Sequence, residues 1–176
     1  MSGARGPASD AVSASVPPFQ SFLDEHRSLV YRFLLATVGP SEADDCFQET
    51  FLAALRAYPR LRRGENLRAW ILTIATRKAI DATRARARRP VPDGETVRER
   101  ADRDGAVEAP HASDPRDPLW RAVRRLPVRQ RAAVVHRHVL DRSYAEIAHA
   151  MRCSEQTARA NVSHGMRALR SMLEAS

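Results

Sequence analysis

The residues best suited to reading a nucleic acid lie near the C-terminal end of the chain. A helix that begins after Ser154 would present one polar face, at about 100° per residue. That face, including its flanks, consists of Gln156, Thr157, Arg159, Ala160, Ser163, His164 and Arg167. Gln can bind adenine, Arg can bind guanine or a phosphate, and Ala is small enough to touch a thymine methyl. The face predicts contact with a DNA major groove; the alternative is a solvated face of an ordinary helical hairpin.

The elements around this face predict a helix-turn-helix. An apolar stripe predicts a short helix over 144–151, a tight turn follows at Arg152 and Cys153, and Ser154 is a suitable N-cap for the last helix. Arg152 would be strained if the turn required a positive φ. The predicted inward residues of the last helix are Ala158, Val162, Gly165, Met166 and Leu169.

Two further helices are predicted just upstream. A short one lies around 119–125, and the next begins with Pro127 as its first residue. Its predicted inward residues are Val134, Val135, Val139 and Leu140.

A second candidate site is a basic helix in the first half of the chain. Asn66 can cap a helix that runs to about residue 89, with Leu67, Trp70, Ile71, Ile74 and Ala75 predicted on its inner face. The basic groups of this helix and the preceding loop are Arg60, Arg62, Arg63, Arg68, Arg77, Lys78, Arg84, Arg86, Arg88 and Arg89. Cations beside an exposed aromatic ring suit single-stranded DNA. Trp70 shares a stripe with Ile71 and Ile74, which favours a core position over base stacking.

A third candidate site is acidic. The first helix is predicted to begin near Pro18 and to end at Gly39 and Pro40, after which Ser41 can cap a second helix. The apolar stripe of the second helix is predicted to comprise Ala43, Cys46, Phe47, Thr50, Phe51, Ala54, Leu55 and Tyr58. Its polar side carries Glu42, Asp44, Asp45, Gln48 and Glu49. An acidic patch in so basic a protein favours a protein partner; the alternative is a solvated helix face.

Charge is distributed unevenly along the chain, whose net charge is +8. Residues 60–90 carry ten basic and two acidic groups, and residues 119–176 carry eleven and four. Acidic groups outnumber basic ones by seven to four in residues 1–59 and by eight to four in residues 91–118. Two basic blocks with an acidic spacer predict two separate contacts with a polyanion.

The same pattern predicts the domain organisation. Residues 1–18 are rich in Ser, Ala, Gly and Pro and are expected to form a disordered leader. Residues 90–118 hold five of the eleven prolines without apolar periodicity, which predicts a flexible acidic linker. The expected fold is therefore all-α, with two small helical domains at 19–89 and 119–176.

Several functional classes are disfavoured. No stretch approaches the roughly 18 uninterrupted apolar residues of a membrane span, so we expect a cytoplasmic protein without membrane insertion. Cys46 and Cys153 fit buried thiols better than redox sensors. His136 and His138 diverge by about 200° on a helix, and no metal-ligand motif is present. We expect no cofactor and no enzymatic activity, and a stand-alone DNA-binding regulator remains an alternative.

Four groups of residues, spread over both halves of the chain, carry a family resemblance. They are Asp45-Cys46-Phe47-Gln48-Glu49-Thr50-Phe51, Arg68-Ala69-Trp70-Ile71 with Ile74-Ala75 and Asp81, Leu126-Pro127-Val128-Arg129-Gln130-Arg131, and Tyr144-Ala145-Glu146-Ile147-Ala148. Together they resemble the extracytoplasmic-function sigma factors of the bacterial sigma-70 family. The resemblance spans roughly residues 19–89 and 119–173. It implies a region 2 helical bundle that binds core RNA polymerase and opens the minus-ten element. It also implies a region 4 helix-turn-helix that reads the minus-thirty-five element.

The resemblance also implies roles for individual residues. The polymerase-binding surface would comprise Asp44, Asp45, Gln48 and Glu49. The minus-ten strand would meet Arg60, Arg62, Arg63, Asn66, Arg68, Trp70, Arg77, Lys78 and Arg84. The minus-thirty-five duplex would meet Ser154, Gln156, Thr157, Arg159, Ala160, His164 and Arg167. Thr76-Arg77 replaces the usual Arg-Asn. Many members bind an anti-sigma factor, which makes such a factor an expected partner.

Overall fold

The computed structural model describes residues 16–62, 66–88 and 118–175, and over these ranges its regular structure is entirely helical. The predicted leader, the linker and the loop residue Arg63 lie wholly or largely outside them. The elements are α1 (Phe19–Val38), α2 (Pro40–Ala57), the short 3₁₀ helix η1 (Tyr58–Arg60), α3 (Leu67–Arg88), α4 (Pro118–Arg125), α5 (Val128–His138), α6 (Tyr144–Met151) and α7 (Glu155–Glu174).

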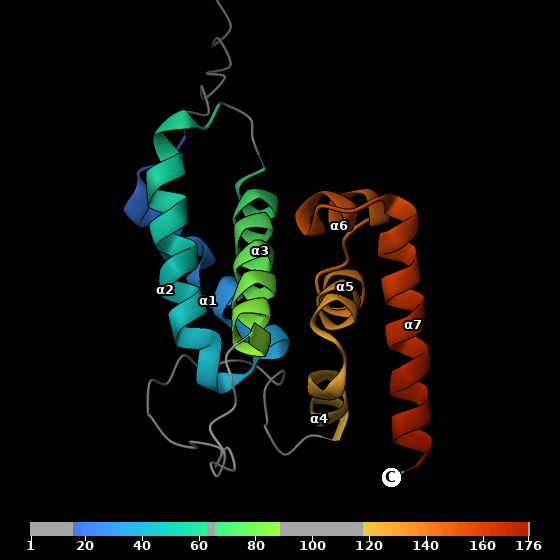
Figure 1. Cartoon of the computed structure of the whole chain (residues 1–176). Coiled ribbons are helices and arrows are strands. Elements are labelled where there is room, and N and C mark those ends of the chain that lie inside the picture. The colour runs from blue at the N-terminus through green and yellow to red at the C-terminus, as the bar shows by residue number, and fades with distance from the viewer. Residues whose placement is uncertain (1–15, 63–65, 89–117, 176) are drawn as a thin grey trace, which may run out of the picture.

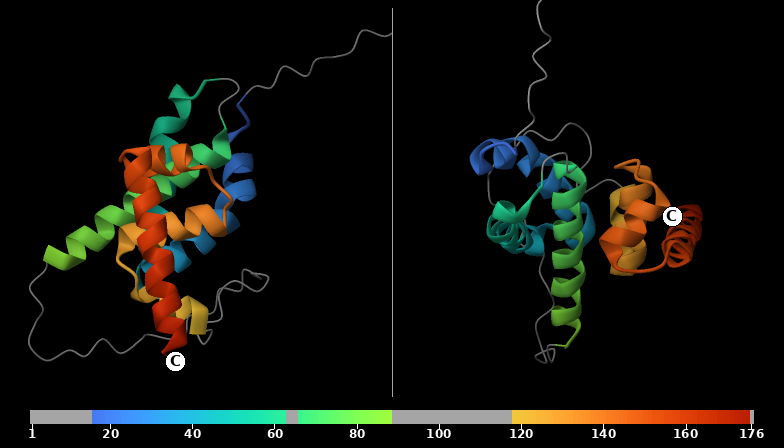
Figure 2. Two further views of the ribbon diagram at one scale, coloured as in Figure 1. Left: turned by 90° about the vertical axis from the view of Figure 1, so that its right-hand side faces the viewer. Right: turned by 90° about the horizontal axis from the view of Figure 1, so that it is seen from above.

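The helices form two groups that lie side by side (Figure 1). The N-terminal group consists of α1, α2 and α3, and the C-terminal group consists of α4 to α7. Seen from above, α3 lies between the rest of its own group and the C-terminal group (Figure 2). Both α5 and α6 pack against α3, while α4 and α5 also pack against α1. The basic helix α3 is therefore covered on two sides.

Helix boundaries in the N-terminal group follow local chemistry. Gly39 adopts φ +87°, which favours glycine, and links α1 to α2. The prediction that Ser41 caps α2 is wrong, because Gly39 is the N-cap and Pro40 occupies the first turn, where its missing N–H costs nothing. The prediction for Asn66 is confirmed, since its Oδ1 accepts a hydrogen bond from the Ala69 N–H at 2.9 Å.

Some apolar positions predicted to face inward are exposed. They are Leu55 on α2 (49%), Val139 at the end of α5 (52%) and Met166 on α7 (37%). Pro127 is the N-cap of α5, so that helix begins one residue later than predicted.

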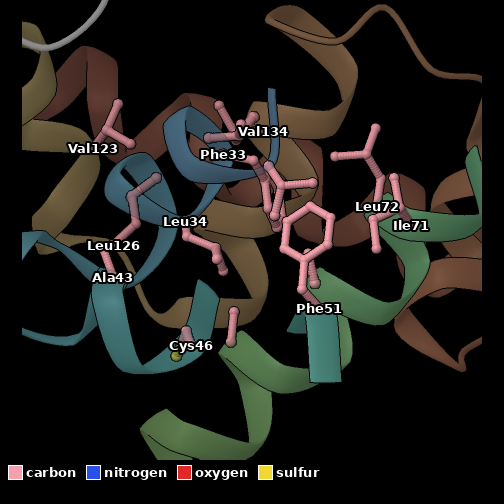
Figure 3. Packing of buried hydrophobic residues seen from close by; sticks show 14 of the residues in the cluster. Phe33, Leu34, Ala43, Cys46, Phe51, Ile71, Leu72, Val123, Leu126 and Val134 are labelled. Carbon is pink, nitrogen blue, oxygen red and sulfur yellow. The ribbon is translucent and has the colours of Figure 1, made fainter. Parts of the chain in front are cut away.

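One buried cluster joins the two groups. Phe33 and Leu34 of α1 belong to the same core as Val123, Leu126 and Val134 of the C-terminal group (Figure 3). In addition, Ile80 of α3 is buried in a second cluster whose other members come from α5, α6, α7 and the turn between α6 and α7. The packing of the two groups against each other therefore removes apolar surface of both groups from water. No described helix has the length and apolar character needed to cross a bilayer.

Candidate nucleic-acid and polymerase interfaces

The predicted helix-turn-helix is formed by α6, α7 and the turn between them. Ser143 caps α6 in a reciprocal box: its Oγ accepts from the Glu146 N–H at 3.3 Å, and Glu146 Oε2 accepts from the Ser143 N–H at 2.9 Å. That second bond is the main reason that the pKa of Glu146 lies below its usual value. The Ser-x-x-Glu spacing signals this box in the sequence, although the sequence reasoning missed it.

The turn has the positive φ under which Arg152 was expected to be strained. Arg152 adopts φ +50°, a left-handed conformation that is uncommon for a residue with a side chain. Ser154 then caps α7, as predicted, by accepting a hydrogen bond from the Thr157 N–H at 3.1 Å. Its Oγ also lies 2.8 Å from Thr157 Oγ1, so both hydroxyl groups are engaged at the helix start.

The outward face of α7 is exposed as predicted. Its exposed members include Gln156, Thr157, Arg159, Ala160, Ser163, His164 and Arg167. On the opposite side Ala158, Val162, Gly165 and Leu169 are buried. A Cβ at Gly165 would lie 2.7 Å from Val134 Cγ2, so α5 and α7 approach more closely than an Ala would permit. The inner side thus fixes which side chains α7 presents to solvent.

Arg159 has two partners within the helix-turn-helix. Its Nη2 donates to Glu155 Oε1 at 2.7 Å, one turn earlier on α7. Its guanidinium carbon lies 4.3 Å from the ring centroid of Tyr144, the first residue of α6. Arg137 of α5 also lies over that ring, at 5.3 Å. The sequence reasoning placed Tyr144 on an apolar stripe and gave it no role.

The acidic side of α2 lies directly beside the basic helix α3. Glu49 Oε2 pairs with Lys78 Nζ at 3.0 Å, and Glu42 Oε1 pairs with Arg86 Nη1 at 2.7 Å. Asp44 accepts a hydrogen bond from the Tyr31 hydroxyl at 3.0 Å. The candidate polymerase surface and the candidate DNA helix are therefore neighbours, joined by the ion pair between Glu49 and Lys78.

The same side of α2 is also apolar further along the helix. Asp45, Gln48 and Glu49 are exposed, and Leu52 and Leu55 follow them with about half of each residue exposed. Exposed leucines beside polar groups are typical of a protein-binding surface. Leu52 was missed because it lies off the apolar stripe that faces the core.

The minus-ten candidates divide into two sets. Arg60, Arg62, Asn66, Arg68 and Arg84 are exposed. In contrast, Trp70 is half-buried, with its ring centroid 5.6 Å from that of Phe22 and 6.2 Å from that of Tyr58. These ring contacts support the core interpretation of Trp70.

Trp70 also lines a cleft between the two groups, as does Arg77. The cleft lies between α3 and α6, and Arg77 is half-buried there, with its Nη2 3.5 Å from the His149 carbonyl oxygen. The α3 side of this cleft is formed by Asn66, Ala69, Trp70, Thr73, Ile74 and Arg77. The α6 side and its preceding turn contribute Arg142, Ala145, Glu146 and His149.

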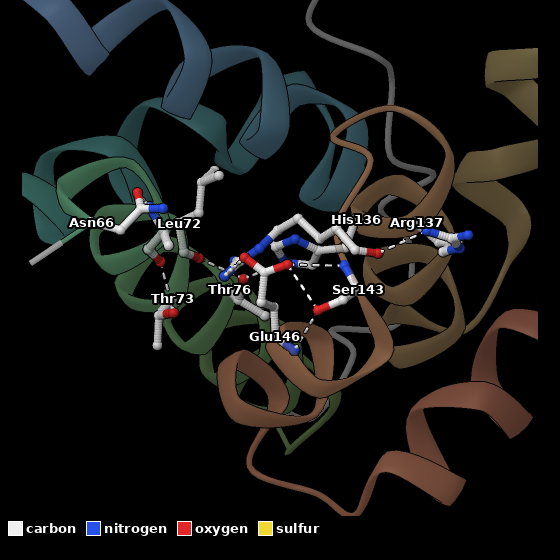
Figure 4. Close-up of polar contacts among 10 residues, drawn as sticks. Asn66, Leu72, Thr73, Thr76, His136, Arg137, Ser143 and Glu146 are labelled. Carbon is white, nitrogen blue, oxygen red and sulfur yellow. Dashed lines mark hydrogen bonds and ion pairs between the residues drawn. The ribbon is translucent and has the colours of Figure 1, made fainter.

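Polar contacts also bind the two groups together (Figure 4). His136 of α5 and Thr76 of α3 are both fully buried, with Nε2 and Oγ1 2.7 Å apart. Burial lowers the pKa of His136 to about 3, and the nearby Arg142 cation acts in the same direction. Arg131 of α5 donates to the Thr37 carbonyl at the end of α1, at 2.6 Å. None of these inter-group contacts was predicted.

The described residues contain two free thiols and no metal-binding cluster. No cluster of three or more His, Cys, Asp or Glu residues that could hold a metal occurs in the described part of the chain. Cys46 is buried, and burial together with nearby carboxylates raises the pKa of its thiol to about 11. A thiol of that pKa is a poor nucleophile at neutral pH. Cys153 is a half-buried free thiol.

Comparison with known proteins agrees with this arrangement. Residues 22–89 match the model of Sigma-70 region 2, and residues 116–169 match that of Sigma-70, region 4. The chain is similar to several sigma factors of Mycobacterium tuberculosis. It is 33% identical to the ECF RNA polymerase sigma factor SigD over 81% of this chain and 70% of that protein. It is 32% identical to the ECF RNA polymerase sigma factor SigL over 94% of each.

Solved structures share the fold. The sigma factor RpoE of Bartonella quintana, in complex with the anti-sigma factor NepR, superposes with a TM-score of 0.69 at 23% identity, over 89% of this chain and 96% of that one. CnrH, in complex with the cytosolic domain of CnrY, gives 0.59 at 18% identity, over 90% and 88%. The family matches favour a sigma factor over the stand-alone regulator considered above. The chain belongs to the extracytoplasmic-function sigma factors of the sigma-70 family, non-enzymatic proteins that direct RNA polymerase in transcription initiation.

Proposed function

We propose that the exposed face of α7 reads the minus-thirty-five element of this sigma factor's promoters. The observation that carries this proposal is the division of the helix: its small and apolar residues are buried, while Gln156, Arg159 and Arg167 are exposed. A helix of this kind at the second position of a helix-turn-helix fits a major groove. Arg159→Ala or Arg167→Ala should weaken promoter binding by about 5- to 150-fold if the side chain reads a base. Arg121→Ala removes an exposed cation of α4 and serves as the control.

The minus-ten strand, in this proposal, follows the exposed cations of the first domain. Arg60, Arg62, Arg68 and Arg84 can neutralise phosphates, with Asn66 beside them at the start of α3. Arg77 becomes fully available only when α6 moves away, because it lies in the cleft between the two groups. Trp70 contributes mainly to packing, and its cleft-facing edge is the part that a base can reach.

The acidic and leucine-bearing side of α2 is the proposed polymerase surface. Reversal of Asp45 and Glu49 to Lys should abolish binding to core polymerase while helical content is retained. Asp24 and Glu25 form an exposed acidic pair on α1 and provide the matched control. Because Glu49 also pairs with Lys78, the Asp45→Lys variant alone should be measured as well. Retained polymerase binding in both the double variant and the Asp45→Lys variant would contradict the assignment of this surface.

Promoter recognition requires the two domains to separate. By the positions in their names, the minus-thirty-five and minus-ten elements are about 25 base pairs apart, which is about 85 Å along B-form DNA at about 3.4 Å per base pair. In contrast, α3 packs directly against α5 and α6, and α7 packs against both of these helices. The proposed linker of residues 90–118 can span about 95 Å when extended, at about 3.3 Å per residue. The chain is therefore long enough to place domains 19–89 and 119–176 on both elements.

Two further assignments belong to the same proposal. Both structural relatives described above are complexes: RpoE with the anti-sigma factor NepR, and CnrH with the cytosolic domain of CnrY. An anti-sigma factor is thus a proposed partner of this chain, which would act with polymerase in the cytoplasm. The direct test is run-off transcription with bacterial core polymerase on a pool of genomic promoter fragments. Specific transcripts only in the presence of the chain would support the function, and their absence would contradict it.

A further inference from the structure

Tyr144 links α7, the helix proposed to read DNA, to α5 and α6. It is the half-buried first residue of α6, which packs against both α5 and α7. One ring therefore contacts a cation from each neighbouring helix: Arg159 of α7 at 4.3 Å and Arg137 of α5 at 5.3 Å. Both distances lie within the range in which the face of an aromatic ring attracts a guanidinium group.

Arg159 needs such support if it is to read DNA with a defined geometry. Its side chain is 59% exposed, and a long exposed side chain occupies many rotamers unless it is held. Glu155 Oε1 binds one end of the guanidinium at 2.7 Å, and the Tyr144 ring lies against its carbon. A guanidinium stacked on a ring keeps N–H groups at its edge available to bind acceptors in the same plane.

Arg137 is held separately. Its Nη1 donates to the Arg142 carbonyl at 3.2 Å and lies 3.7 Å from Asp141 Oδ1. These contacts keep Arg137 at the turn between α5 and α6, so it does not depend on Tyr144 alone. The side chain that has most to gain from the ring is therefore Arg159, which projects from α7.

We propose that Tyr144 is a positioning residue that holds the Arg159 guanidinium in the orientation used at the minus-thirty-five element. The inference rests on the proposed function of α7 and adds a residue that need not touch a base. Tyr144 acts by reducing the freedom that Arg159 loses on binding, which strengthens the complex without a new contact. Removal of the Tyr144 ring should therefore weaken promoter binding only when Arg159 is present.

The experiment is a double-mutant cycle in holoenzyme assembled from the full chain and core polymerase. Binding to a promoter fragment identified by run-off transcription is measured at one fixed salt concentration. An exposed cation–π contact corresponds to about a two- to fivefold change in an equilibrium constant. Tyr144→Leu should weaken binding by about that factor, whereas Tyr144→Phe, which keeps the ring, should bind like the unmodified chain. In an Arg159→Ala background, Tyr144→Leu should have no further effect.

Three results would overturn the proposal in distinguishable ways. Equal weakening by Tyr144→Leu with Arg159 and with Ala at that position would show that Tyr144 only packs α6. An unchanged affinity for Tyr144→Leu, with Arg159→Ala still harmful, would overturn the positioning role and leave the function of α7 intact. An unchanged affinity for Arg159→Ala would remove the proposed role of Arg159 itself. Far-ultraviolet circular dichroism of each variant would verify that the helices remain folded.

Discussion

The hydrogen bond between Thr76 and His136 provides a sharp test of how the two groups are held together. Thr76 Oγ1 lies 2.6 Å from the Leu72 carbonyl and 2.7 Å from His136 Nε2. A hydroxyl has one proton, which it donates to the carbonyl, so it accepts from an Nε2–H; the geometry thereby assigns this tautomer. Thr76→Val keeps the shape of the side chain and removes the acceptor.

The expected cost follows from burial. Both residues are fully buried, so the ring N–H would lose its partner where water cannot replace it. An unsatisfied buried donor costs about 1–3 kcal/mol. Thr73→Val is a matched control on the same helix, because the Thr73 hydroxyl donates to Ala69 O at 2.8 Å within α3. We expect about 0.5 kcal/mol for that control, the lower end of the range for a typical hydrogen bond.

Urea unfolding followed by tryptophan fluorescence measures both variants. Trp70 reports on the N-terminal group and Trp120 on the C-terminal group. With an m value of about 2 kcal/mol/M, Thr76→Val should lower the midpoint by about 0.5–1.5 M, and Thr73→Val by no more than about 0.25 M. Equal shifts for the two variants would refute the assignment of a stabilising bond between the groups.

Three other predictions concern stability. Burial lowers the pKa of His136 to about 3, so the folded state favours the neutral ring, and the free energy of unfolding should fall as the pH drops from about 6.5 towards 3. Urea midpoints at several pH values would measure this fall, which corresponds to a change in the unfolding equilibrium constant of up to about tenfold per pH unit. Gly165→Ala should cost about 1–3 kcal/mol through its clash with Val134, and the double variant with Val134→Ala should unfold at a higher midpoint than the two separate losses predict. Ser154→Ala should cost about 1 kcal/mol in thermal unfolding by removing the cap of α7, whereas Ser163→Ala on the exposed face should have little effect.

Local signals in the sequence were sufficient for most of the helices. The caps Asn66 and Ser154 were predicted correctly because a cap depends on residues within one turn. The outward face of α7 was predicted for the same reason, since helical geometry alone decides which side chains share a face. Periodicity does not reveal how much of an apolar stripe the neighbouring helices cover. The exposure of Leu55 and Met166, which lie on apolar stripes, was therefore not predicted.

Contacts between helices that are distant in the sequence were not predictable in this way. Thr76 and His136 are polar residues that a helical wheel places without preference, and they are buried only because α5 docks on α3. The pairing of Lys78 with Glu49 similarly depends on the separation of α2 and α3. Each of these contacts needs the relative position of two helices, which no local pattern encodes.

Under the proposed function, the docking of α5 and α6 on α3 opposes promoter binding. Domains packed in this way would not reach two elements about 85 Å apart, so the binding energy of polymerase and promoter would have to offset the free energy of closure. Thr76→Val weakens closure by about 1–3 kcal/mol, which would raise the apparent affinity for core polymerase and promoter by about 5- to 150-fold where the closed form predominates. Run-off transcription at limiting core polymerase should therefore increase for Thr76→Val and remain unchanged for Thr73→Val. If Thr76→Val lowered the urea midpoint without increasing transcription, closure would not compete with promoter binding, and the proposed separation of the domains would be wrong.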